Sequence, residues 1–143
     1  MDTPNSIDNL NEFMSLSLQY YEKMDYNNAL KYAALASVST DYPRADVCCQ
    51  MGDIYLERGN LDWAKFWFER AIGNIYVDHN GEKLDEAFYT WVPMLKLSYI
   101  MYKLGDIETA FQYNESVLLI QPENEDAISN REFLSGILER KEE

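Results

Sequence analysis

Apolar positions recur at steps of three and four along most of the chain, which predicts amphipathic helices rather than strands. One set of small and large apolar residues alternates at Gly52, Tyr55, Gly59, Ala64, Phe68 and Ala71. The same spacing recurs at Ser17, Tyr20, Met24, Ala29, Ala33 and Ala36, and again at Ser98, Met101, Gly105, Ala110, Asn114 and Val117. Such a recurrence indicates three copies of a helix-turn-helix unit of roughly 34 residues.

The recurrence predicts an all-α solenoid of three helix hairpins and a C-terminal capping helix, formed by one domain over residues 1–143. We expect repeats at about 10–43, 45–76 and 91–123, and the capping helix at 124–140. The seven helices are expected near 8–24, 27–39, 43–58, 61–75, 90–104, 107–120 and 124–140. Gly52 and Ala64 are small enough to let the helices of one hairpin approach closely, while Tyr55 and Phe68 fill the space between stacked hairpins.

The junction between the second and third repeats carries an insertion at 74–89. His79-Asn80-Gly81 predicts a turn, and the stretch from Lys83 to Tyr89 predicts an added helical turn before Trp91. Long loops often carry function, but a neutral surface insertion explains the sequence equally well.

These three segments resemble tetratricopeptide repeats. The second matches best, since Gly59-Asn60 stands at its inter-helix turn, and the third ends at Pro122 as the family pattern expects. The first departs from the pattern, with Met24 in place of a Gly and Ala33 in place of an aromatic residue. The resemblance implies a module that holds another polypeptide.

Net charge and composition restrict the classes of molecule that this chain is expected to bind. The formal net charge is −13, from 25 acidic and 12 basic residues, which argues against a nucleic-acid partner and favours a neutral or basic protein surface. Alternatively, the acid excess only keeps a solvated helical surface soluble. No apolar run is long enough for a membrane span, and the adjacent Cys48 and Cys49 indicate a reducing, cytoplasmic location.

The residues that enzymes use are scarce in this chain. There is one His, His79, in a predicted turn, and two neighbouring cysteines do not complete a tetrahedral metal site. No Gly-rich phosphate loop of standard spacing occurs. We therefore expect no catalytic activity, no cofactor and no metal.

In this architecture the first helix of each hairpin lines the binding groove. Helical position assigns to it Asn11, Met14, Leu18, Tyr21, Asp46, Cys49, Gln50, Asp53, Leu56, Leu95, Lys96, Tyr99 and Tyr102. Tyr among hydrogen-bonding neighbours suits peptide recognition, but Tyr99 and Tyr102 would be unavailable if they packed on the closing helix instead.

One branch of the repeat family binds a partner's C-terminal carboxylate through a clamp of Lys, Asn, Asn, Lys and Arg. The corresponding positions here hold Met14, Leu18, Gln50, Val92 and Lys96. Only Lys96 keeps the required charge, so the resemblance implies that this carboxylate clamp is absent.

A second possible interface is the outer edge of the first hairpin. Phe13, Leu16 and Tyr20 have no preceding hairpin to cover them, which suggests self-association or missing upstream sequence. A structural homodimerisation module without peptide binding is therefore the alternative to a groove that holds a partner.

A narrower resemblance covers Tyr42 to Asn130. The Cys48-Cys49 pair, the aromatic stretch 66–68 and the Trp-x-Pro entry at Trp91 are similar to the tetratricopeptide region that follows the catalytic domain of bacterial family-2 glycosyltransferases. That likeness implies a role in docking a substrate protein or in dimerisation. The chain has no Asp-x-Asp type motif for a metal-bound sugar nucleotide, so it would be the non-catalytic part.

Overall fold

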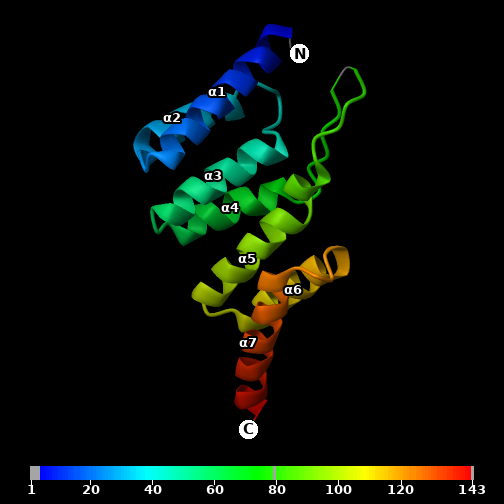
Figure 1. Cartoon of the computed structure of the whole chain (residues 1–143). Coiled ribbons are helices and arrows are strands. Elements are labelled where there is room, and N and C mark those ends of the chain that lie inside the picture. Colours follow the sequence, from blue (N-terminus) through cyan, green and yellow to red (C-terminus); the bar gives the residue numbers. More distant parts are fainter. Residues whose placement is uncertain (1–3, 79, 143) are drawn as a thin grey trace.

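The computed structural model describes residues 4–78 and 80–142, and seven α-helices account for most of these described residues. The helices are α1 (Pro4–Glu22), α2 (Tyr26–Ser37), α3 (Ala45–Glu57), α4 (Leu61–Ala71), α5 (Trp91–Lys103), α6 (Ile107–Ile120) and α7 (Glu125–Glu142), with a 3-10 helix η1 (Glu86–Tyr89) before α5. Figure 1 shows three antiparallel hairpins stacked in chain order, with α7 packed on the last. The predicted all-α solenoid of three hairpins and a closing helix is confirmed.

The two largest boundary errors are equal: α1 begins at Pro4 and not near residue 8, and α4 ends at Ala71 and not near residue 75. Ile72 already has extended backbone angles, and Gly73 follows with a φ of 72°, in the left-handed region that favours glycine. The Gly73 N–H donates to the carbonyl of Tyr89 at 2.9 Å. The helix therefore stops where the start of the insertion is tied to its end.

The insertion forms a narrow arm that projects from the stack of hairpins in Figure 1. Val77 and Lys83 pair across it in an isolated antiparallel bridge, and an Asp78 carboxylate oxygen accepts from the N–H groups of Asn80 and Glu82 at 2.9 and 2.8 Å. The predicted helical turn before Trp91 is present as η1. His79 lies outside the described residues.

The three inter-helix turns share one construction, in which a left-handed residue precedes a side chain that caps the next helix. The pairs are Met24-Asp25, Gly59-Asn60 and Gly105-Asp106, with φ values of 62°, 75° and 89° at the first residue. In each pair the capping oxygen accepts from a backbone N–H of the following turn. Met24 is the one non-glycine with positive φ among the described residues.

Met24→Gly is expected to stabilise the fold by about 1 kcal/mol, because the left-handed conformation costs an L side chain roughly that much and Gly avoids it. The Met24 side chain is 73% exposed, so little packing is lost. Urea unfolding followed by circular dichroism measures the change. Met24→Ala is the control: it also shortens the side chain but keeps the strain, so equal gains in both variants would contradict this explanation.

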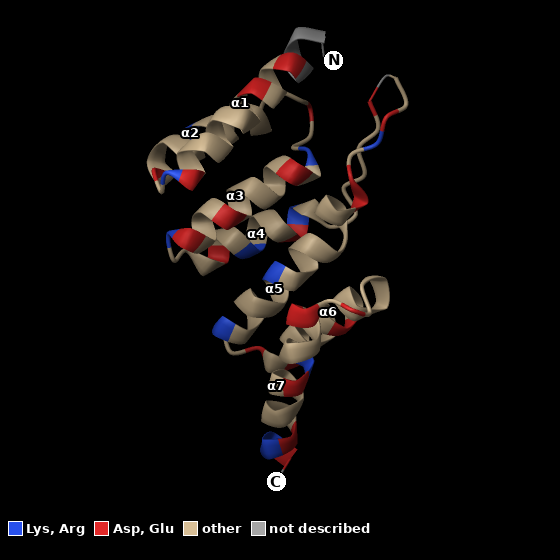
Figure 2. Cartoon of the chain, in the orientation of Figure 1, with Lys and Arg blue, Asp and Glu red and all other residues tan. Residues whose placement is uncertain are grey.

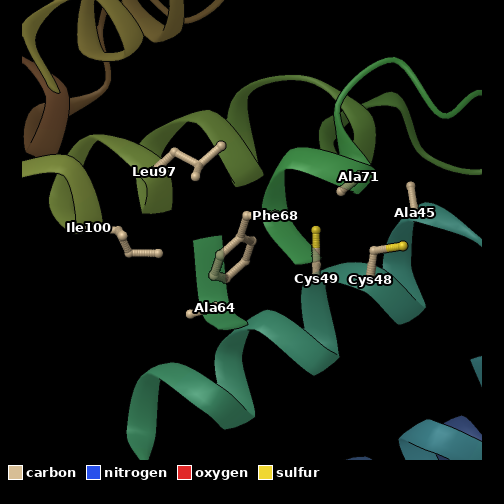
Figure 3. Close-up of a cluster of buried hydrophobic side chains, with 8 residues drawn as sticks. All are labelled: Ala45, Cys48, Cys49, Ala64, Phe68, Ala71, Leu97 and Ile100. Atoms are coloured by element: carbon tan, nitrogen blue, oxygen red, sulfur yellow. The ribbon is translucent and has the colours of Figure 1, made fainter. Parts of the chain in front are cut away.

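The core between the second and third hairpins is centred on Phe68 (Figure 3). Its buried members are Ala45, Cys48, Cys49, Ala64, Phe68, Ala71, Leu97 and Ile100. A Cβ added at Gly52 would lie 2.7 Å from the Phe68 ring, so the absence of a side chain at Gly52 makes room for that ring. The predicted pairing of small and large residues is confirmed here.

In the first and third hairpins, other residues occupy the positions that correspond to Gly52 and Phe68. Ser17 and Ser98 replace the glycine, and their hydroxyls donate to the carbonyls of Ala29 and Ala110, each at 2.8 Å. The residues that correspond to Phe68 are smaller, Ala33 and Asn114. A larger residue on one helix is thus matched by a smaller one on the other, and the buried hydroxyls remain hydrogen-bonded.

Within the described part of the chain, every helix is too short or too polar to cross a lipid bilayer.

Candidate interaction surface

Three of the predicted groove residues are buried, so their assignment to an accessible groove was wrong. Gln50 donates to the hydroxyl of Ser17 at 3.0 Å and ties α3 to α1, while the Cys49 thiol faces the carbonyl of Phe88 in η1 at 3.4 Å. Met14 packs in a core cluster with Val47 and neighbouring residues. These side chains hold adjacent elements together instead of facing a partner.

Of the other ten predicted residues, Asn11 and Asp46 accept hydrogen bonds from the Arg44 guanidinium, and Leu95 packs against the cluster of Val117, Leu118 and Ala127. The remaining seven lie at a surface that we call the inner face. It consists of exposed or half-buried side chains from the first helix of each hairpin and from α7. Its members are Leu18 and Tyr21 on α1, Asp53 and Leu56 on α3, Lys96, Tyr99 and Tyr102 on α5, and Phe133 on α7. Leu18, Tyr99 and Phe133, which recur at one position of the repeat, are 45%, 48% and 51% exposed.

Two hollows run along the inner face and share Tyr99. The first, which we call the α5–α7 cleft, has a volume of about 150 Å³. Its lining residues are Ser98, Tyr99, Tyr102, Asn130, Phe133 and Leu134. The second has a volume of about 430 Å³ and is lined by Leu56, Glu57, Gly59, Leu61, Tyr99 and Lys103. Because both include Tyr99, apolar surface continues from α3 across α5 to α7.

The charges at the predicted groove positions are matched in pairs. Lys96 Nζ lies 3.2 Å from Asp53 Oδ1, and Arg44 Nε lies 2.7 Å from Asp46 Oδ1. Burial raises the pKa of Asp53, and the positive charge of Lys96 opposes that rise. Figure 2 shows few charged residues on α5, whose sequence contains two lysines and no acid. Lys96 is therefore already engaged by a carboxylate of the same chain.

Tyr21 contributes a hydrogen-bond donor to the inner face. Its hydroxyl lies 3.5 Å from Glu57 Oε1, at the limit of a hydrogen bond. Burial, followed by the negative charges of Asp53 and Glu57, raises the pKa of Tyr21 to about 12. The phenol is protonated at neutral pH, and Glu57 is the acceptor of its hydroxyl in the structure.

Tyr102 and Tyr99 behave differently. The Tyr102 ring meets the Phe133 ring edge to face, with centroids 5.2 Å apart and an interplanar angle of 76°, so the alternative that Tyr102 packs on the closing helix is correct. Tyr99 remains half exposed. We did not predict Phe133 for this surface, although it lies 34 residues after Tyr99, one repeat length, and that spacing could have identified it.

The outer edge of the first hairpin is partly covered by its own side chains, contrary to our expectation of an open edge. Phe13 and Tyr20 both stack on Tyr32 of α2, with centroid distances of 6.3 and 5.6 Å, and all three, like Leu16, are half-buried. The ammonium group of Lys31 lies 5.4 Å from the centroid of the Tyr32 ring. This cover reduces the apolar area available for self-association.

Both cysteines are buried free thiols. Burial raises the pKa of Cys48 to about 11, and it also raises the pKa of Cys49. A protonated, inaccessible thiol is a poor nucleophile. Among the described residues, no group of His, Cys, Asp and Glu side chains is arranged to hold a metal ion.

Comparison with known proteins identifies the fold. Residues 45–75, which contain α3 and α4, match the family model described as tetratricopeptide repeat. A search of curated proteins finds no match. Solved structures similar to this chain include the following three. The Arabidopsis OM64 TPR domain is 14% identical, with a TM-score of 0.73, and the match covers 90% of this chain and 96% of that one.

The second is the first TPR of Spaghetti (RPAP3), bound to the HSP90 peptide SRMEEVD, at 14% identity and a TM-score of 0.74, covering 92% of this chain and 94% of that one. The third is a tetratricopeptide repeat protein from Parabacteroides merdae ATCC 43184, at 18% identity and a TM-score of 0.74, covering 92% of this chain and 48% of that one. The chain therefore has the all-α tetratricopeptide solenoid fold, and its second hairpin is a tetratricopeptide repeat.

Proposed function

We propose that this chain is a non-catalytic protein-interaction module whose inner face binds a polypeptide. The observation that carries the proposal is the set of exposed side chains Leu18, Tyr99 and Phe133 on α1, α5 and α7, together with two hollows that share Tyr99 and lie between α3, α5 and α7. Aromatic side chains that are half exposed at a concave site are typical anchors for a partner.

The fold supports this proposal, because tetratricopeptide repeats mediate protein–protein interactions and one similar structure holds a peptide. The peptide that this chain binds is expected to differ from SRMEEVD, the peptide held by that similar structure. At the clamp positions this chain has Met14 and Gln50, which are buried, and Lys96, which is paired with Asp53. The acidic net charge of −13 favours a neutral or basic partner over an acidic peptide such as SRMEEVD.

Selection from a random peptide display library, followed by fluorescence anisotropy with a selected peptide, tests the proposal. We expect Leu18→Ala and Tyr99→Ala each to weaken binding about tenfold, since each removes an exposed anchor worth about 1.4 kcal/mol. Helical content should not change, because neither side chain belongs to the core.

The chain offers a matched control for each variant. Leu119 and Tyr42 are 85% and 81% exposed and do not belong to the inner face, so Leu119→Ala and Tyr42→Ala should retain full affinity. Selected peptides that bind equally well to all four variants would rule out the inner face as the binding site.

Structural homodimerisation through Phe13, Leu16 and Tyr20 remains the alternative function. It is supported by the absence of a preceding hairpin on that edge among the described residues, but the Tyr32 stack already covers part of it. Sedimentation velocity over a range of concentrations distinguishes the two functions. The alternative would be favoured if Leu16→Lys dissociates a dimer and the display selection yields no binding peptide.

We also propose, from the sequence resemblance between Tyr42 and Asn130, that the module serves a bacterial glycosyltransferase. The residues that carry this resemblance include Cys48, Cys49 and Phe68, which are packed together in one core cluster. The resemblance would therefore mean that the second and third hairpins pack against each other in the same way in this chain and in those glycosyltransferases. A glycosyltransferase domain encoded upstream of Met1, in frame or adjacent, is the expected finding in the genomic sequence.

A cytoplasmic location forms part of the same proposal and is supported by two buried thiols that are not in a disulfide. Fractionation of the native host cells tests it.

A further inference from the structure

The α5–α7 cleft differs from the rest of the inner face because it is a defined cavity between two helices. Tyr99 and Tyr102 border it on α5, and Asn130 and Phe133 border it on α7. The edge-to-face contact between Tyr102 and Phe133 fixes one wall, and Leu134, which is 3% exposed, contributes buried apolar surface. The cleft is therefore bounded on one side by packed side chains, while Tyr99 and Phe133 are about half exposed.

Its size suits a single side chain. A cavity of about 150 Å³ holds a benzene-sized group. The side chains of Leu, Met and Phe are of that order, whereas a whole peptide segment is far larger. An occupant would thus insert one side chain and rest its backbone along the inner face.

The charge of the surroundings excludes several occupants. None of the six described residues that line the cleft is charged, so a carboxylate or ammonium group inserted there would lose its hydration without gaining an ion pair. Lys96, the one cation at a clamp position, is 3.2 Å from Asp53. Among the described residues, no cation lines the cleft itself, where a partner's C-terminal carboxylate would need one.

The same reasoning disfavours a second copy of the chain as the occupant. Each copy carries a formal charge of −13, so two copies repel one another, whereas a neutral or basic partner is attracted.

We propose that the α5–α7 cleft is an anchor pocket that takes one uncharged apolar side chain, of Leu, Met or Phe size, from an internal segment of a different polypeptide. This inference rests on the proposed function and names the chemistry that the partner must present. Transfer of the apolar side chain from water into the cleft stabilises the complex.

Disulfide tethering at the cleft tests this without knowledge of the partner. Asn130→Cys places a thiol at its rim, and the native Cys48 and Cys49 are buried. The probes are mixed disulfides that carry an isobutyl, benzyl, carboxyethyl or aminoethyl group, and intact-protein mass spectrometry measures capture at increasing 2-mercaptoethanol. We expect the isobutyl and benzyl groups to resist about tenfold more reductant than the charged groups.

Two further variants test whether the preference for apolar probes depends on the cleft. Gln112→Cys, on the exposed side of α6, should show no such preference, because that position borders no apolar cleft. Phe133→Ala combined with Asn130→Cys should reduce the preference, since it removes one wall. Equal capture of all four probes at Asn130→Cys, or preferred capture of the carboxyethyl group, would overturn the anchor pocket.

The peptide selected by display provides a second readout. We expect its free-acid and C-terminally amidated forms to bind with equal affinity, because an internal segment makes the contacts. A tenfold loss on amidation, or a dimer of the chain that Phe133→Ala dissociates, would also overturn the inference. Leu18 belongs to the inner face but does not line the cleft. If Leu18→Ala weakens peptide binding while the tethering experiment shows no preference for apolar probes, the proposed function is supported and the anchor pocket is ruled out.

Discussion

Replacing Phe68 with alanine is expected to destabilise the fold by about 4 kcal/mol, the largest effect of any single change considered. The Phe68 ring is fully buried and contacts the second and third hairpins at once, in the cluster that includes Leu97 and Ile100. Gly52 cannot fill the vacated space, because it has no side chain. The cavity therefore remains, and its cost adds to the lost transfer free energy of the ring.

Chemical denaturation followed by circular dichroism at 222 nm measures this loss. Since domains are commonly stable by about 5–15 kcal/mol, the variant should remain folded at low temperature but have a much lower midpoint. Phe133→Ala is the matched control: the same ring is removed from a position that is 51% exposed, and the expected loss is below about 1 kcal/mol. Similar losses in both variants would show that Phe68 does not have this central position.

The second large effect is expected at Gly52. Gly52→Ala should destabilise the fold by about 2 kcal/mol, although alanine is favoured over glycine in a helix by up to about 1 kcal/mol. The added Cβ would lie 2.7–2.8 Å from three atoms of the Phe68 ring, so the ring or the helix must shift. The cost of that overpacking exceeds the gain in helix propensity.

A double-mutant cycle separates the two contributions. In a Phe68→Ala background the clash is absent, so Gly52→Ala should become stabilising by about 1 kcal/mol through helix propensity alone. The sign of the Gly52→Ala effect is thus expected to invert. An equally unfavourable effect in both backgrounds would mean that Gly52 is needed for a reason other than the Phe68 ring.

The sites where prediction failed share a physical cause. Cys49 and Gln50 lie at helical positions that point toward the groove, which is all that the spacing within one helix can tell. Whether such a side chain is accessible depends on what other segments do: η1 brings Phe88 onto Cys49, and α1 brings Ser17 to Gln50. Periodicity within a segment carries no information about contacts made by a segment 30 or more residues away.

The edge of the first hairpin illustrates the same limit. The sequence predicts correctly that Phe13 and Tyr20 share a face of α1, but it does not show that Tyr32 of α2 reaches across to stack on both. The rotamers that allow this stacking are selected by packing between helices. They cannot be read from the order of residues along either helix.

The sequence alone determined the hairpins, their turns and their order, because these depend on local chemistry: apolar spacing, left-handed positions and capping side chains a few residues apart. Only the tertiary structure decided which inward-pointing residues stay accessible, that Lys96 is engaged by Asp53, and that Phe133 and Tyr99 enclose a cleft. Those features arise where separate helices meet, and the geometry of that meeting is set by the packing of the whole stack.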